Sequence, residues 1–251
     1  MMTPEWLTAR PIAHRGLHDA ADGVIENTLS ACAAAAAAGY AIEVDLQLSA
    51  DGEAMVFHDD TLDRLTEATG PVAARTAAEL KAVRFRDTDD VMMRFSELLT
   101  LVSGHVPLIV ELKSRFDGDP TLVRRAAEVA AAYGGPLALM SFDPAPIADL
   151  RTLAPGIVRG ITAERHYADP EWNGLSAIRK QVLGNLLHWP ASRPQFVAFC
   201  LSDLPTVATE VARRALGVPV LTWTVRTPED RARAKRWADQ MIFEGFRPKP
   251  A

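Results

Sequence analysis

The sequence has 251 residues, of which 48% are hydrophobic, and its formal net charge is −5 at pH 7. Single α/β barrels of this length are common, so we expect residues 1–251 to form one domain. The basic residues are scattered rather than clustered, which disfavours a nucleic-acid partner, and no run of about 18 apolar residues predicts a membrane span. We therefore expect a small-molecule substrate. The sequence leaves the oligomeric state open.

The cysteines and the first residues indicate a compartment. Cys32 lies in an alanine-rich segment and Cys200 in an apolar run, so both are interpreted as core residues rather than as part of a disulfide framework. The start of the chain lacks the basic and apolar regions of a signal peptide. We therefore expect a cytoplasmic location.

Nine short apolar runs alternate with helix-like segments. These runs are residues 11–14, 41–48, 54–57, 107–112, 136–142, 157–162, 196–201, 219–225 and 240–246. Strands that alternate with helices indicate a mostly parallel sheet. A closed eight-stranded barrel needs only eight of the runs, and the connection between the second and third is too short for a helical crossover. One of the nine is therefore expected to lie outside the barrel.

Helix ends are recognisable in several of the intervening segments. An alanine-rich helix is expected to begin at Asn27 or Thr28 as N-cap and to stop at Gly39, and another to run from Asp203 to Gly217. Residues 59–106 are the least regular part of the chain. We interpret them as a short excursion from the barrel.

The turn Asp51-Gly52 predicts a two-residue hairpin that joins the second and third apolar runs. Centring the hairpin on this turn pairs Asp45 with His58. Side chains alternate along strands, so each face of the hairpin would carry its own set. The polar face would carry Glu43, Asp45 and His58. The apolar face would carry Val44, Leu46 and Phe57.

Acidic residues inside apolar runs predict a metal site. Glu43 and Asp45 lie within the second run, where burying two neighbouring carboxylates is costly unless a cation or hydrogen bonds neutralise them, and a metal is the simplest answer. Glu111 ends the fourth run, and Lys113 shares its face. Three carboxylates without a cysteine cluster form a hard-oxygen site, which suits Mg²⁺ or Ca²⁺.

The first run ends in residues that suit phosphate chemistry. His14 can accept or donate a proton, Arg15 can hold an oxyanion with two donors, and Gly16 permits a tight turn. Barrel enzymes assemble their sites at the carboxyl ends of the strands, where these residues and the acids are expected.

Short motifs along the chain form an ordered set. They are HRG 14–16, ENT 26–28, EVD 43–45, DG 51–52, FHDDTLDR 57–64, TGP 69–71, ELK 111–113, SF 141–142 and WTV 223–225. Together they resemble the glycerophosphodiester phosphodiesterase family of the PLC-like phosphodiesterase superfamily. The resemblance implies a (β/α)8 TIM barrel, with a β-hairpin after the second strand and a short insertion. It also implies hydrolysis of glycerophosphodiesters to an alcohol and glycerol 3-phosphate, with one divalent cation.

The resemblance also implies roles for individual residues. The implied metal ligands are Glu43, Asp45 and Glu111, and the acid/base pair is His14 and His58. The implied phosphate-binding residues are Arg15 and Lys113, with Glu26 and Asn27 supporting the metal and phosphate region. Phe142 and Trp223 end strands that face the barrel mouth, so we expect them either to line the substrate pocket or simply to pack there.

Two departures from the family pattern fall at the rim of the barrel. Arg226 follows WTV where the family has asparagine, and Glu244 lies where the last strand typically ends in a Thr-Asp pair. The segment VMMRFSEL also replaces a proline-containing one. The chemistry is expected to be intact, but these changes leave the identity of the alcohol open.

Plainer interpretations remain open for several residues. Glu43 and Asp45 are also compatible with ordinary acids on a solvent-facing strand, and Asn27 with a helix cap. Lys113 and Glu111 are compatible with a plain ion pair. Two other functions compete with the hydrolase: a phospholipase D-like or C-like enzyme that releases a cyclic phosphate, and a catalytically silent binding barrel.

Overall fold

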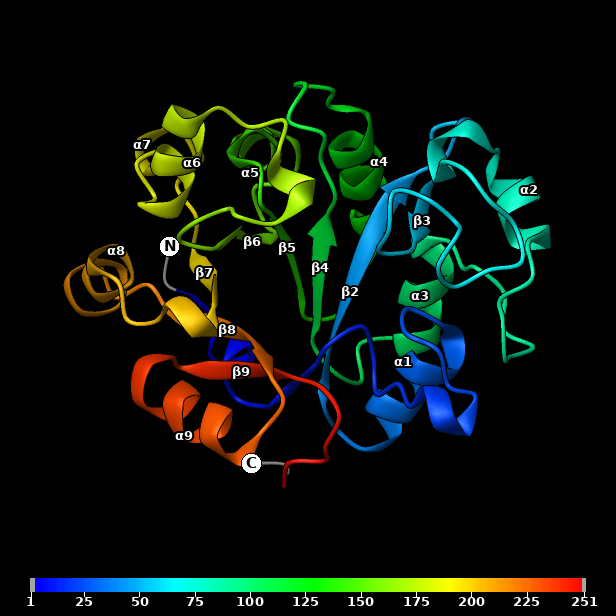
Figure 1. Cartoon of the computed structure of the whole chain (residues 1–251), viewed down its shortest axis with the longest axis horizontal. Helices are drawn as coiled ribbons and strands as arrows, with labels where there is room; N and C mark the ends of the chain where they lie inside the picture. The colour runs from blue at the N-terminus through cyan, green and yellow to red at the C-terminus, as the bar shows by residue number, and fades with distance from the viewer. Residues whose placement is uncertain (1–2, 250–251) are drawn as a thin grey trace.

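The computed structural model describes residues 3–249, in which eight parallel strands close into a barrel surrounded by helices (Figure 1). The barrel strands are β1 Ile12–Ala13, β2 Ala41–Leu48, β4 Leu108–Leu112, β5 Leu137–Ser141, β6 Val158–Ala163, β7 Phe196–Cys200, β8 Val220–Val225 and β9 Gln240–Phe243. Their order is β1-β9-β8-β7-β6-β5-β4-β2, and a β1–β2 pairing closes the ring. The predicted (β/α)8 barrel is confirmed.

The ninth strand, β3 (Ala54–Val56), pairs antiparallel with β2, so the expected hairpin after the second barrel strand is confirmed. Its predicted register is wrong by one residue, because Leu46 lies opposite Val56. The backbone N–H of Ser49 donates to the carbonyl of Glu53 at 2.9 Å, which closes a three-residue loop. Gly52 takes φ +81° in that loop, a conformation that glycine adopts without strain.

The register shift changes which side chains share a face. The Phe57 N–H donates to the Asp45 carbonyl, so Phe57 rather than His58 lies opposite Asp45. Phe57 packs in a cluster with Met55 and Leu62, not with Val44 and Leu46 as predicted. His58 follows the end of β3, where strand alternation no longer constrains it, and still reaches the barrel mouth.

The α-helices surround the barrel (Figure 1). They are α1 Leu29–Ala37, α2 Ala77–Ala82, α3 Phe95–Val102, α4 Thr121–Ala130, α5 Pro144–Leu153, α6 Ala177–Gly184, α7 Trp189–Ser192, α8 Val207–Glu210 and α9 Pro228–Trp237. Of the two expected caps of α1, Thr28 is the one observed, since its hydroxyl accepts from the Ala31 N–H. The helix expected over 203–217 is shorter, because Thr206 caps its start and α8 begins at Val207; it continues as a π-helix at Val211–Ala215.

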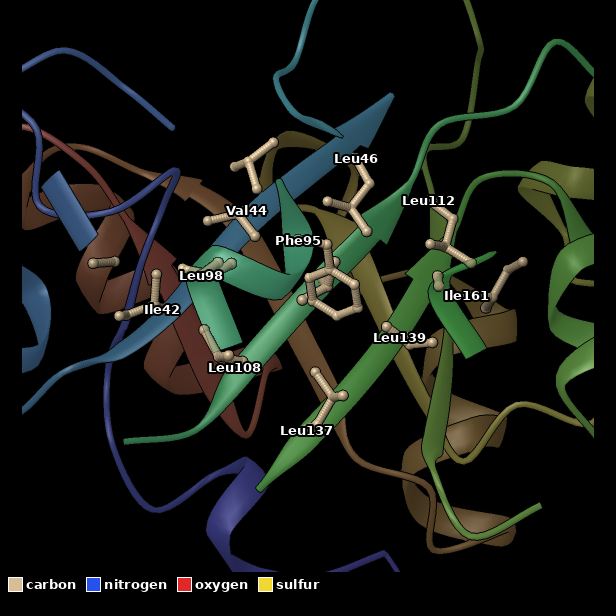
Figure 2. Close-up of a cluster of buried hydrophobic side chains, with 14 of the residues drawn as sticks. Ile42, Val44, Leu46, Phe95, Leu98, Leu108, Leu112, Leu137, Leu139 and Ile161 are labelled. Atoms are coloured by element: carbon tan, nitrogen blue, oxygen red, sulfur yellow. The ribbon is translucent and has the colours of Figure 1, made fainter. Parts of the chain in front are cut away.

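The main core fills the layer between the strands and the helices, and α3 contributes Phe95 and Leu98 to it (Figure 2). The strand side chains around them alternate outward from the barrel, namely Ile42, Val44, Leu46, Leu108, Leu112, Leu137, Leu139 and Ile161. Leu98 is fully buried, so a Leu98→Ala change is expected to cost about 2–5 kcal/mol of unfolding free energy.

A second cluster fills the lower interior of the barrel. Ile109, Met140 and Phe196 belong to it. Gly160 provides room for one of these side chains, because a Cβ at that position would lie 2.2 Å from the Phe196 ring. This apolar floor leaves only the upper part of the interior, at the carboxyl ends of the strands, for polar side chains.

The region 59–106 contains α2 and a separate small core (Figure 1). Leu80 and Phe85 pack there under the loop that follows β3. Within the same region, α3 contacts α1 and α4. In residues 3–249, no helix combines the length and apolar content that crossing a bilayer requires.

Candidate active site

A pocket of about 420 Å³ opens where the barrel strands end. Its walls divide into a charged half and an aromatic half. The charged half comprises His14, Arg15, Glu43, Asp45, His58, Glu111 and Lys113. The aromatic half comprises Phe116, Phe142, Trp172 and Trp223.

The loop after β1 brings a backbone donor to the acids. Arg15 has φ 55°, and its N–H donates to Glu43 Oε2 at 3.0 Å. Gly16 follows with φ +82°, and a Cβ there would lie 2.8 Å from the backbone of Ala31. The predicted tight turn at Gly16 is therefore present, and it requires glycine both for its φ and for its close approach to α1.

Strand register brings the three acids together. Glu43 and Asp45 are two residues apart on β2, so they point to the same side of the strand. Asp45 lies directly opposite Glu111 of the neighbouring parallel strand β4. One carboxylate oxygen from each of the three residues lies within 4.8 Å of the others. All three side chains are buried, so the interpretation of Glu43 and Asp45 as solvent-facing acids is wrong.

Crowding shifts the protonation of these acids. Burial raises the pKa of Glu43 well above its ordinary value, and the charges of Asp45 and Glu111 raise it further. The pKa of Glu111 is also raised, again mainly by burial. Burial alone would raise the pKa of Asp45 too, but Lys113 and other nearby cations bring it below its ordinary value. Ionisation of Glu43 and Glu111 is thus unfavourable in this pocket, and a cation bound beside them would favour their ionised forms.

Two basic side chains partly balance the acids. Lys113 Nζ lies 2.9 Å from Asp45 Oδ1 and 2.6 Å from Glu111 Oε1. Arg15 Nε lies 3.5 Å from Asp45 Oδ2. Lys113 thus contacts both acids rather than Glu111 alone, and it also lines the pocket. With all five groups ionised, one negative charge would remain.

This donor set fits a divalent cation. The ligand atoms are carboxylate oxygens, which Mg²⁺ and Ca²⁺ prefer, and their spacing allows one ion to contact all three residues. The residual charge of the acids also favours a cation, because a divalent ion and a phosphodiester monoanion together would leave the site neutral.

Asn27 and Glu26 lie behind the pocket wall. The Asn27 amide donates to Asp45 Oδ2 at 3.0 Å, and its oxygen accepts from the Asp45 N–H at 3.2 Å. Asn27 therefore orients a predicted metal ligand, while Thr28 caps the helix. Glu26 Oε1 accepts from Arg15 Nη1 at 2.7 Å and fixes that guanidinium at the edge of the site.

His14 is held by an acid from the other end of the chain. Its Nδ1 lies 2.7 Å from Glu244 Oε2, and Arg226 Nη2 donates to the same oxygen at 3.1 Å. Its Nε2 lies 4.0 Å from Glu43. Burial lowers the pKa of His14, and the hydrogen bond to Glu244 partly opposes this shift. The two departures at the rim, Arg226 and Glu244, thus lie together behind His14.

His58 has a similar partner. Its Nδ1 lies 2.7 Å from Asp59 Oδ1, and Arg64 donates two hydrogen bonds to the Asp59 carboxylate. The Gln47 amide donates to the His58 carbonyl at 3.0 Å, which fixes the backbone at this point. The pKa of Glu244 is lowered to about 2, and that of Asp59 is also lowered, so both acids are ionised at neutral pH. Each Nδ1 therefore carries a proton, and each Nε2 is free to accept one.

The opposite wall is built from aromatic rings. The Phe142 ring packs edge-on against Trp223, with 5.7 Å between centroids, and lies 4.8 Å from the Trp172 ring. Trp223 Nε1 donates to the Ala198 carbonyl, which fixes the indole. The hydroxyl of Thr162, which also lines the pocket, is buried without a hydrogen-bond partner. Among the described residues, Nε1 of Trp172 is likewise buried without a partner. This wall therefore offers apolar surface and two unpaired polar groups to a substrate.

The structure places all of the predicted site residues at or directly behind one pocket. Sequence reasoning missed the partners of the two histidines. Asp59 and Arg64 stand inside the quoted motif FHDDTLDR, so their proximity to His58 was a usable signal. Glu244 was noted only as a departure, and nothing local in the sequence connects it with His14.

Comparison with known proteins gives a consistent result. The model of the glycerophosphoryl diester phosphodiesterase family matches residues 14–246. A glycerophosphodiester phosphodiesterase from Caldanaerobacter subterraneus subsp. tengcongensis is 26% identical over 232 residues, which cover 88% of each chain.

Solved structures agree with the fold. The chain resembles a glycerophosphodiester phosphodiesterase from Thermotoga maritima with a TM-score of 0.69 and 25% identity, over 92% of each chain. It also resembles an Oleispira antarctica phosphodiesterase in complex with the product sn-glycerol-3-phosphate, with a TM-score of 0.75 and 22% identity, covering 93% of this chain and 91% of the other. At that identity, the second likeness concerns the fold alone.

Proposed function

Because this chain belongs to the glycerophosphoryl diester phosphodiesterase family, we propose that it hydrolyses glycerophosphodiesters to an alcohol and glycerol 3-phosphate, using one divalent cation and two histidines. One observation carries this proposal. Three buried carboxylates with a shared ligand position lie in the same pocket as two imidazoles whose Nδ1 atoms are already engaged.

The proposed metal ligands are Glu43, Asp45 and Glu111, and the ion is Mg²⁺ or Ca²⁺. When bound, such an ion would polarise a phosphoryl oxygen and neutralise the charge that grows there. Arg15 and Lys113, which both line the pocket, would bind the phosphate with their guanidinium and ammonium groups.

The histidines would move protons through Nε2. One imidazole would take the proton of the attacking group, which is either a water molecule or a hydroxyl of the substrate's glycerol. In the second case the alcohol leaves as a cyclic phosphate forms, and a water would then have to attack phosphorus and open this ring to give glycerol 3-phosphate. The other, protonated beforehand, would give its proton to the departing alkoxide, so the alcohol leaves neutral. Glu244 and Asp59 would hold the two rings in position and stabilise their protonated forms.

A product assay tests the proposal. The protein is incubated with a panel of glycerophosphodiesters and with Mg²⁺ or Ca²⁺, and the products are separated. We expect metal-dependent release of alcohol together with glycerol 3-phosphate. Accumulation of a cyclic phosphate would instead identify the phospholipase-like reaction. No turnover with any substrate and metal would support a silent binding barrel.

We also propose the cytoplasm as the location of this protein. Both Cys32 and Cys200 are free thiols in the structure, as a reducing compartment would maintain. Cell fractionation would test this assignment.

A further inference from the structure

Arg64 makes an unusually complete set of hydrogen bonds just outside the pocket. Its Nε and Nη2 donate to the two oxygens of Asp59 at 2.7 and 2.8 Å. Its Nη1 and Nη2 donate to the two oxygens of Glu26 at 2.9 and 2.8 Å. One planar guanidinium therefore joins two carboxylates, each through a two-donor contact.

Each of these carboxylates holds a residue of the site. Asp59 Oδ1 lies 2.7 Å from Nδ1 of His58, and Glu26 Oε1 accepts from Nη1 of Arg15 at 2.7 Å. Arg64 itself is not among the residues that line the pocket. It is thus one group removed from a proton-transfer residue on one side and from a phosphate-binding residue on the other.

The bridge also joins two loops that are distant in sequence. Glu26 comes from the loop between β1 and α1, whereas Asp59 and Arg64 follow β3. Without Arg64, the negative charges of Glu26 and Asp59 would repel each other with no cation between them. Glu26 would then keep only Arg15 as a cationic partner among the described residues. Loss of the bridge would therefore disturb both sides of the site.

We propose that Arg64 is a positioning residue that couples His58 to Arg15 by holding Asp59 and Glu26 at a fixed separation. The inference rests on the proposed roles of His58 and Arg15 in phosphodiester hydrolysis. It assigns the last residue of the motif FHDDTLDR to the reaction, although this residue touches no substrate.

A plain surface ion pair is the competing interpretation, and the chain provides a matched control for it. Arg125 on α4 donates to both oxygens of Glu53 at 2.9 and 3.0 Å. Its side chain is 36% exposed, compared with 46% for Arg64. Ion pairs of this kind contribute little to stability, so Arg125→Gln reports what the loss of such a pair does by itself.

The kinetic test compares Arg64→Gln with Arg125→Gln. For Arg64→Gln we expect kcat to fall by about 10-fold to 100-fold, the range typical of residues that orient active-site groups. We also expect KM to rise, because Arg15 would no longer be held in position to bind the phosphate. Arg125→Gln should retain both constants within about twofold. Arg64→Lys should recover little, because an ammonium cannot make two-donor contacts with two carboxylates.

Double variants test the route of the effect. If Arg64 acts on His58 through Asp59, adding Arg64→Gln to Asp59→Asn should not lower kcat further, since the two changes remove the same interaction. In the same way, adding it to Glu26→Gln should not raise KM further. Fully additive losses in both pairs would overturn the proposed coupling.

A second measurement does not depend on turnover. Nitrogen NMR of ¹⁵N-histidine protein, with the His58 signals assigned by His58→Gln, reports which ring nitrogen carries the proton. We expect a single Nδ1–H form in the wild type and in Arg125→Gln, and a mixture of forms in Arg64→Gln. An unchanged His58 spectrum in Arg64→Gln would overturn the inference. A wild type without turnover would contradict the proposed function, while this spectrum would still decide the role of Arg64.

Discussion

The two halves of the pocket are built in different ways. The charged half comes mainly from strands β2 and β4 and from the loop after β1, and its acids are set by the register of Asp45 against Glu111. The aromatic half depends more on loops, since Phe116 and Trp172 lie outside the strands. Strand-borne groups are fixed by the barrel itself, whereas loop-borne groups vary without disturbing it. We therefore expect the charged half to perform the chemistry and the aromatic half to select the alcohol.

The largest effects should follow from loss of a proposed metal ligand. In Glu43→Gln and Glu111→Gln we expect activity to fall by at least about 10³-fold, because the cation site and the transition-state charge it stabilises are lost together. Isothermal titration with Mg²⁺ and Ca²⁺ should show a matching loss of binding. Glu171→Gln, an acid beside the aromatic half, is the control and should bind the metal normally.

Loss of a histidine should separate chemistry from metal binding. In His14→Ala and His58→Ala we expect kcat to fall by about 10²-fold to 10⁴-fold, the usual contribution of a general acid or base. Metal affinity measured by the same titration should stay within a few-fold of the wild type. If either variant lost the metal as completely as Glu43→Gln, the assignment of that histidine to proton transfer would be wrong.

The pH profile should reveal which histidine is the base. The pKa of His14 is lowered by burial, and Glu244 raises it in part, so Glu244→Gln should lower it further. A base must be unprotonated to act, so if His14 is the base the acidic limb of kcat/KM moves to lower pH. If His14 is the acid, the alkaline limb moves to lower pH instead. Two unmoved limbs would mean that His14 does not set this profile.

Smaller and more selective effects should come from the aromatic half. Trp223→Ala and Phe142→Ala each remove one of two rings whose centroids lie 5.7 Å apart. We expect KM to rise by about 2-fold to 10-fold, to a different extent for each alcohol, while metal affinity stays unchanged. Trp237→Ala on α9 is the matched control. Equal losses for every substrate in the panel would indicate that these rings only pack against each other.

Much of the fold could be predicted from the sequence. Buried parallel strands are short apolar runs, and all nine of them correspond to observed strands within a few residues. The spacing of Glu43 and Asp45 was enough to place both on one side of β2. The hairpin register could not be predicted in this way, because Asp51-Gly52 occurs in loops of two and of three residues, and only the Ser49–Glu53 contact distinguishes them.

The hydrogen-bond partners of the two histidines could not be predicted from the sequence for a different reason. Glu244 lies 230 residues from His14, so only closure of β9 against β1 brings them together. Arg64 was visible in its motif, but its second carboxylate, Glu26, comes from a loop 38 residues earlier. Contacts of this kind depend on tertiary structure rather than on local pattern.

The central claim is that one divalent cation binds among the three acids. A crystal structure of the protein grown with Mn²⁺, which prefers the same oxygen ligands, would locate the ion directly by its anomalous scattering. We expect one peak with carboxylate oxygens of Glu43, Asp45 and Glu111 at about 2.0–2.6 Å. A fully occupied peak elsewhere, or these three side chains turned away from the ion, would contradict the account.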